Sequence, residues 1–152
     1  MIEKAIESAF PQLQGSDWRV SSKADDQYNC IAWAAKVTTN WWWPVGSEKT
    51  YWPKDAPREV TLEAFQKAFA SLGYIVCEGA ELEAGFEKIA LFANDQGVPK
   101  HAARQLADGS WTSKLGKLED IEHPLQHLTG SLYGSIALIM KRNAKPESEH
   151  GA

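Results

Sequence analysis

The stretch HAARQLADGSWTSKLG, residues 101–116, decides the fold. It contains two runs of strand-forming residues, and the pair Asp108-Gly109 between them is a strong signal for a tight hairpin turn. The two runs therefore predict neighbouring antiparallel strands, joined by a short loop.

Further strands are predicted on both sides of this hairpin. The segments YIVCEG (74–79), FEKIALFAND (86–95) and YGSIALIMKR (133–142) are rich in β-branched and aromatic residues and are bounded by turn signals. The segment EDIEHPLQHLTG (119–130) favours a short helix or a turn instead. The second half of the chain is thus expected to form a sheet of four to five antiparallel strands.

Helices are expected before these strands. Residues 2–9 carry apolar side chains at helical spacing and are followed by Pro11, which ends a helix. Asn29 is a suitable N-cap for a short amphipathic helix in the segment CIAWAAKV (30–37), and TLEAFQKAFASLG (61–73) has a longer apolar stripe that stops at a glycine. We expect an α+β fold in which N-terminal helices pack on the sheet.

Length and composition fit one globular domain. The chain has 152 residues, of which 43% are hydrophobic and 24% charged, close to the average of soluble proteins. We expect a single domain over residues 1–142 and a flexible polar tail over residues 143–152.

Charge and hydropathy argue against two classes of partner. The net charge of −4, without a basic stripe, argues against binding to nucleic acid, which depends on clustered Lys and Arg. No apolar run has the length of a signal peptide or a membrane span, so we expect no membrane association. The expected location is the cytoplasm, or the exterior by an export route that needs no cleaved signal.

The two cysteines, Cys30 and Cys77, are expected to be free thiols, because one pair in a chain of this length is no disulfide scaffold. Cys77 alternates as a packing residue of a strand. Cys30 lies in the first turn of its helix, where unpaired N–H groups and the helix dipole lower a thiol pKa. Cys30 is therefore the candidate nucleophile, although a cysteine on an apolar helix face is often only a core residue.

A nucleophilic thiol needs a base, and the base needs an orienting partner. His101 starts the first strand of the hairpin, next to the small residues Ala102 and Ala103. The returning strand brings Ser113 or Lys114 level with it, and the pattern alone leaves open which one shares its face.

This arrangement resembles papain-like cysteine peptidases and amidases, especially the small NlpC-type and CHAP-type cell-wall hydrolases. In those families a histidine-bearing strand is followed by a glycine turn. An aromatic residue then comes two positions before the third polar residue. Here Trp111 follows the turn, so the resemblance selects Ser113 as that third residue, although Ser113 brings no charge. NCIAWAA, HAARQLADGSWTSKLG and EDIEH also resemble a bacterial domain family that supplies no activity.

The resemblance implies a papain-like fold and thiol hydrolysis of a peptide-like or cell-wall-like bond, without a cofactor. Cys30 would attack the carbonyl carbon, His101 would take and return the proton, and Ser113 would fix the imidazole. The candidate binding residues are polar or aromatic side chains expected around the cleft: Asn29, Trp33, Trp43, Trp52, Lys114 and His123.

The sequence is also compatible with two other function classes. A non-catalytic module of the same fold would hold a peptide or glycan through its Trp and Tyr side chains, with Cys30 as a core residue. An RNA-modifying protein or nuclease that uses His101 with Lys114 is disfavoured by the acidic charge. No metal is expected, because Pro124 interrupts the pair His123 and His127 and no further ligand is placed beside them.

Overall fold

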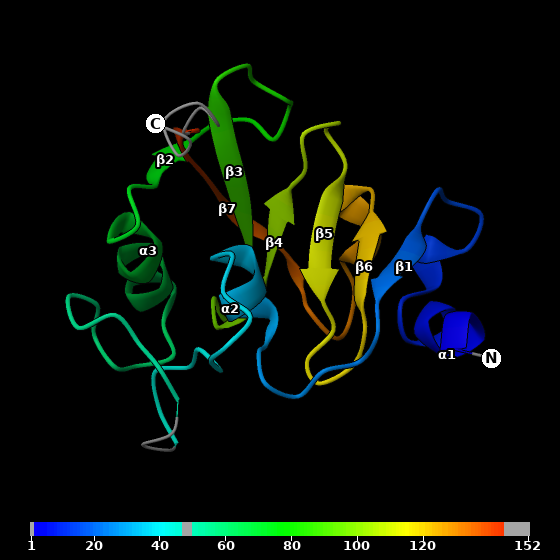
Figure 1. Cartoon of the computed structure of the whole chain (residues 1–152), viewed down its shortest axis with the longest axis horizontal. Coiled ribbons are helices and arrows are strands. Elements are labelled where there is room, and N and C mark those ends of the chain that lie inside the picture. The colour runs from blue at the N-terminus through cyan, green and yellow to red at the C-terminus, as the bar shows by residue number, and fades with distance from the viewer. Residues whose placement is uncertain (1, 47–49, 145–152) are drawn as a thin grey trace.

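The computed structural model describes residues 2–46 and 50–144, which form helices on both faces of one antiparallel sheet (Figure 1). The helices are α1 (Ile2–Ala9), α2 (Cys30–Ala34) and α3 (Leu62–Ala70), with the short 3-10 helices η1 (Pro11–Leu13) and η2 (Leu125–Leu128). The strands are β1 (Arg19–Ser22), β2 (Ile75–Cys77), β3 (Phe86–Ala93), β4 (Pro99–Gln105), β5 (Trp111–Lys114), β6 (Asp120–His123) and β7 (Ser135–Asn143).

The sheet has seven strands in the order β1-β6-β5-β4-β3-β7-β2. The expected α+β class is confirmed, whereas the expected count of four to five strands is wrong. Both additional strands lie at one end of the sheet, where β6 pairs with β5 and β1 pairs with β6. They were missed because each has four residues and carries polar side chains, including Arg19 and Glu122, which pair across the outermost strands.

The segment 119–130, expected to be a helix or turn, is divided by Pro124. Its first part is β6, in which His123 pairs with Trp111 and Asp120 pairs with Lys114 of β5. Only Leu125–Leu128 is helical. Proline lacks an N–H and fixes its own φ, so the ladder stops there and the chain turns into η2.

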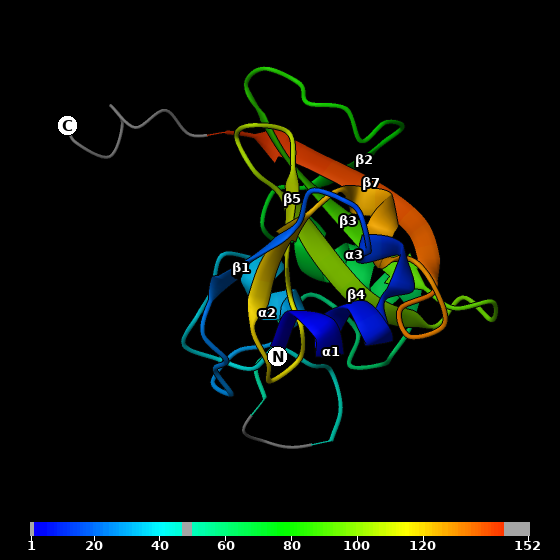
Figure 2. The same ribbon diagram turned by 90° about the vertical axis from the view of Figure 1, so that its right-hand side faces the viewer.

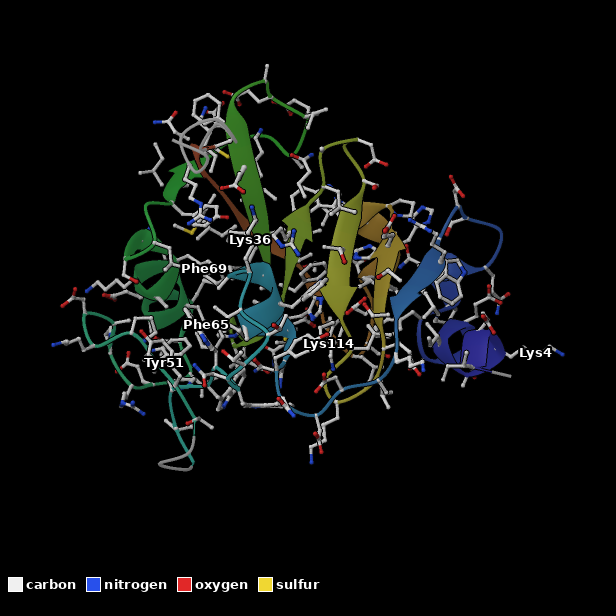
Figure 3. All side chains as sticks on the ribbon, viewed as in Figure 1. Lys4, Lys36, Tyr51, Phe65, Phe69 and Lys114 are labelled. Carbon is white, nitrogen blue, oxygen red and sulfur yellow. The ribbon has the colours of Figure 1, made fainter. Side chains whose placement is uncertain are left out.

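The sheet separates two apolar clusters. On one face, α2, α3 and the aromatic loop after α2 pack on Leu91 and Ala102, and Figure 3 shows Phe65 and Phe69 on the side of α3 turned toward α2. On the other face, α1, η1 and η2 pack on Phe92. In Figure 2, which is turned by 90° from Figure 1, α1 lies at the front of the molecule and β7 curves along the right of the sheet.

The expected cap at Asn29 is present, and α3 has a cap as well. The side chain of Asn29 accepts a hydrogen bond from the Ala32 N–H, and that of Thr61 accepts one from the Ala64 N–H. At the other end of the chain, β7 continues to Asn143 and Ala144 is still hydrogen-bonded to a carbonyl, so the ordered part runs past the expected boundary at 142. The rest of the expected tail lies outside the described residues.

Candidate functional site

The predicted hairpin forms, and its two strands separate at the end where His101 lies. Strands β4 and β5 pair only at Arg104 with Thr112 and at Gln105 with Trp111. Beyond these pairs no ladder joins β4 to β5 among the described residues. The start of β4 therefore leaves backbone groups free to bond something other than a strand.

One of these groups, the Ala102 N–H, acts on the thiol of Cys30. Cys30 begins α2, and the backbone N–H groups of Ala102, of Ile31 and of Cys30 itself act to lower the pKa of its thiol. The residue is only 7% exposed. Burial outweighs these N–H groups and raises the pKa of the thiol to about 11. The prediction of a lowered thiol pKa is wrong, because it took account of the helix terminus and not of the burial.

The ring of His101 is fully buried and is hydrogen-bonded on one side only. Its Nε2 lies 2.8 Å from the hydroxyl oxygen of Ser113. Its Nδ1 has no hydrogen-bond partner among the described residues. Burial, and secondly the neighbouring His123, hold the pKa of His101 well below its usual value, so the ring is neutral.

The Ser113 hydroxyl joins His101 to a second histidine. Its oxygen also lies 2.8 Å from Nε2 of His123, and Nδ1 of His123 donates to the Pro124 carbonyl at 2.8 Å. Burial lowers the pKa of His123 to about 4, against the opposing effect of the Pro124 hydrogen bond. The structure decides which residue of the returning strand faces His101. Ser113 shares the sheet face of His101, whereas the Lys114 side chain points to the other face.

Tyr133, in the loop before β7, is a site residue that the sequence analysis missed. Its ring is stacked on the imidazole of His101, with 3.9 Å between the ring centroids and 6° between the planes. Burial raises its pKa above the usual value, and a charge on Cys30 would raise it further. Tyr133 thus contacts His101 and lies within electrostatic range of the Cys30 sulfur. The only sequence signal was the pair Gly130 and Gly134 around it.

Cys30 and His101 reach this place from opposite faces of the sheet. Cys30 belongs to the cluster of α2 and α3, while His101 pairs with Phe92 and lies on the face of η2. No hydrogen bond joins the thiol to the imidazole within the described part of the chain. Ala102, the residue after His101, belongs to the cluster of Cys30, and its N–H lowers the pKa of the thiol.

Three of the six candidate binding residues are fully engaged inside the protein. Asn29 is 3% exposed and bonds both the N–H and the carbonyl of Trp42. Trp52 is 3% exposed, packs on Phe65 and donates its indole N–H to a backbone carbonyl. Lys114 is fully buried, and its ammonium donates to the carbonyls of two loops. Their expected role at an open cleft is corrected to a structural one.

The other three candidates differ in exposure. Trp33 and Trp43 are partly buried, Trp33 stacked on Tyr28 and Trp43 edge-on to Phe65. His123 is a fourth buried candidate, fully enclosed in the hydrogen-bonded chain with Ser113, so its expected binding role at an open cleft is wrong as well. Only the two tryptophans keep surface that a ligand can touch.

A depression of about 370 Å³ on the surface is lined by Ala24, Asp25, Asp26 and Lys117, and by none of the candidate site residues. Among the described residues, no three His, Cys, Asp or Glu side chains are grouped as a metal ion requires. No helix in that part of the chain is both long and apolar enough to cross a membrane.

Comparison with known proteins places the chain in a family without assigning an activity. No curated protein and no solved structure matches it. The model of one family, described as a domain of unknown function (DUF7689), matches residues 19–141, which include Cys30, His101, Ser113 and His123. Because this match spans most of the sequence, the chain belongs to the DUF7689 family.

Proposed function

We propose that this protein is a thiol hydrolase of papain-like topology, a cysteine peptidase or amidase that acts on a peptide-like bond. The observation that carries the proposal is the unpartnered Nδ1 of His101, in a ring that stacks on Tyr133, which lies within electrostatic range of the Cys30 sulfur. Buried ring nitrogens of histidine are normally hydrogen-bonded, and one left free is a ready proton acceptor.

The resting pair is neutral, so the thiol proton moves only during attack. The Cys30 sulfur forms a bond to the carbonyl carbon while its proton passes to Nδ1 of His101. The proton then goes to the leaving amine as the carbon–nitrogen bond breaks, which leaves a thioester. Water attacks the thioester, gives a proton to Nδ1, and the sulfur recovers that proton as the carbon–sulfur bond breaks.

The rate of alkylation of Cys30 by iodoacetamide, measured against pH, tests this proposal. The Cys77→Ser variant leaves Cys30 as the single thiol. If His101 removes the proton, the rate is constant from neutral pH up to the onset of thiol ionisation, because the base is already free. If the thiol reacts unaided, the rate rises tenfold per pH unit over the same range.

His101→Gln supplies the matched control, since glutamine keeps a polar group of similar length without a titratable base. It is expected to convert the level profile into the rising one, with the fold checked by circular dichroism. A second measurement uses p-nitrophenyl acetate, which should release nitrophenolate and leave an acetyl group on Cys30 detectable by mass. A rising profile in the Cys77→Ser protein and no acetylation would overturn the hydrolase.

A second function is favoured by a separate observation. The 7% exposure of Cys30 and its raised thiol pKa, about 11, are also what a packing cysteine shows. In that case the protein is a peptide- or glycan-binding module that uses the partly exposed rings of Trp33 and Trp43. Cys30→Ser and Cys30→Ala would then leave binding unchanged, as measured by the quenching of tryptophan fluorescence by soluble peptidoglycan fragments.

A further inference from the structure

The hydrogen bonds from His101 to Pro124 have one consistent set of donors. A carbonyl oxygen only accepts, so Nδ1 of His123 carries a proton. A neutral imidazole carries a single proton, so Nε2 of His123 is an acceptor. The Ser113 hydroxyl, 2.8 Å from it, therefore donates to His123.

The donor role of Ser113 toward His123 also fixes the direction of the hydrogen bond between Ser113 and His101. Since the hydroxyl proton of Ser113 is used toward His123, its oxygen accepts from Nε2 of His101 at 2.8 Å. His101 consequently carries its proton on Nε2, and Nδ1 keeps a lone pair. This is the nitrogen that has no partner among the described residues.

Building on the proposed function, we propose that His123 is a positioning residue that acts through Ser113 to hold His101 in the Nε2-protonated tautomer, leaving Nδ1 as the base for Cys30. The far end of the chain is fixed, because the Pro124 carbonyl also accepts the His127 N–H at the start of η2. His101, Ser113 and His123 are all fully buried, so water does not compete for these bonds.

This relay replaces a charged third residue. When Nδ1 of His101 accepts the thiol proton, its Nε2–H already donates to Ser113, and that bond becomes charge-assisted. Ser113 in turn keeps its hydroxyl directed at His123, so the whole chain keeps its directions during proton transfer. The positive charge is stabilised without any carboxylate in the hydrogen-bonded chain.

Nitrogen-15 NMR of the imidazole rings tests the relay without reference to activity. In the labelled full chain at neutral pH, His101 should show a proton on Nε2 and a free Nδ1, and His123 the reverse. The ring signals are assigned from His101→Gln and His123→Gln. A proton on Nδ1 of His101, or an imidazolium at neutral pH, would overturn the proposal.

Paired variants separate positioning from simple packing. Gln at position 123 extends an amide to about the place of Nε2, where it can still accept from Ser113, whereas Asn ends near Nδ1 and cannot. Likewise Ser113→Thr keeps the hydroxyl and Ser113→Ala removes it. We expect H123Q and S113T to keep the His101 tautomer, and H123N and S113A to give a tautomer mixture and an alkylation rate of Cys30 lowered about tenfold.

The outcomes distinguish the relay from the hydrolase. If His101 and His123 have the predicted tautomers but the alkylation rate of Cys30 rises with pH, the hydrolase proposal is wrong and the hydrogen-bonded relay has only a structural role. If folded S113A and H123N keep the full, pH-independent rate of Cys30 alkylation, the relay proposal is wrong and the hydrolase proposal stands. Thermal unfolding of each variant shows that the folded state is the one measured.

Discussion

The imidazole of His101 lies flat on the phenol ring of Tyr133, and the edge of a second ring, Phe92, closes it from another side. The stacked centroids are 3.9 Å apart with planes at 6°, and the Phe92 centroid is 5.1 Å away at 74°. Two rings therefore restrict rotation of the imidazole, while the π-face of Tyr133 is suited to a positive charge on it.

Replacement of Tyr133 by Leu should loosen the imidazole, while Phe should preserve its position. Phe keeps the stacked face and lacks only the hydroxyl, and Leu removes the face. We expect the upfield ring-current shift of the His101 ring protons to persist in Y133F and to disappear in Y133L. The stability of Y133L to urea should fall by about 1 kcal/mol more than that of Y133F. An unchanged ring-current shift in Y133L would contradict the stacking.

Gly134 is expected to be the glycine most sensitive to substitution, because it brings the Tyr133 loop against β3. A methyl group there would lie 2.0 Å from the Ala93 carbonyl oxygen, and the backbone has a φ of +77°. Gly97 has the same φ of +77° and open space around it, which makes it a matched control. Gly97→Ala should cost about 1–2 kcal/mol from backbone strain alone.

Gly134→Ala should cost more than this control, since the clash with backbone adds to the strain. Urea unfolding of both variants gives the comparison, and the His101 ring protons report whether Tyr133 has moved. Equal free energies of unfolding for the two variants would show that the loop moves away from β3 without cost.

The hairpin and the order of helices before strands were predictable because their signals are local. Asp108 accepts from the Ser110 N–H, and Gly109 has a φ of +92°, so the turn forms as its two residues indicate. Asn29 and Thr61 cap their helices for the same reason, since each bond spans three residues. Interactions over so few residues can be predicted from the local sequence.

The rest depends on contacts between distant segments. β1 is polar and exposed, and it becomes a strand only because β6 supplies a partner. Ser113, rather than Lys114, meets His101 because of how β4 and β5 pair, which depends on the register set at Arg104 and Thr112. Tyr133 reaches the imidazole from a loop between η2 and β7, and no residue spacing encodes that contact. Burial, which reverses the expected thiol pKa of Cys30, is likewise a property of the whole fold.

Lys114→Met should destabilise the protein although it removes a buried charge. The ammonium donates to the carbonyls of Asp25 at 2.6 Å and Gly116 at 2.7 Å, and methionine leaves both without that donor. Both carbonyls are partly buried, and an acceptor left unpaired away from water costs about 1–3 kcal/mol. The nearby exposed Lys117 is the control, and Lys117→Met should change stability by less than about 0.5 kcal/mol. Equal urea midpoints for the two variants would contradict this role.

Asn29 should tolerate Asp better than Ala. Its side-chain oxygen caps α2 and accepts the Trp42 N–H, while its amide donates to the Trp42 carbonyl at 2.7 Å. Asp keeps the acceptor bonds and loses the donor, whereas Ala loses all three. We expect Asn29→Ala to cost at least about 2 kcal/mol, from the lost cap and the unpaired Trp42 groups. Thermal unfolding measures the stability of each variant. If N29A proved as stable as N29D, the prediction would be contradicted.

Acid should destabilise the folded state through its two buried neutral histidines. Burial holds the pKa of His123 at about 4 and that of His101 well below its ordinary value. Between the unfolded value of about 6.5 and these folded values, the unfolded chain binds protons that the folded chain does not, so stability falls as pH falls. His123 accounts for about 3 kcal/mol of this loss, complete near its folded pKa.

The difference between wild type and His123→Gln isolates that contribution, because all carboxylates are common to both. His127 and His101 face His123 and remain in the variant, so the coupling to them is the only other change. Urea unfolding at neutral pH and at about pH 4.5 should show a smaller acid loss in H123Q than in wild type. Identical losses would mean that folding does not lower the pKa of His123, and would contradict a neutral ring between Ser113 and Pro124.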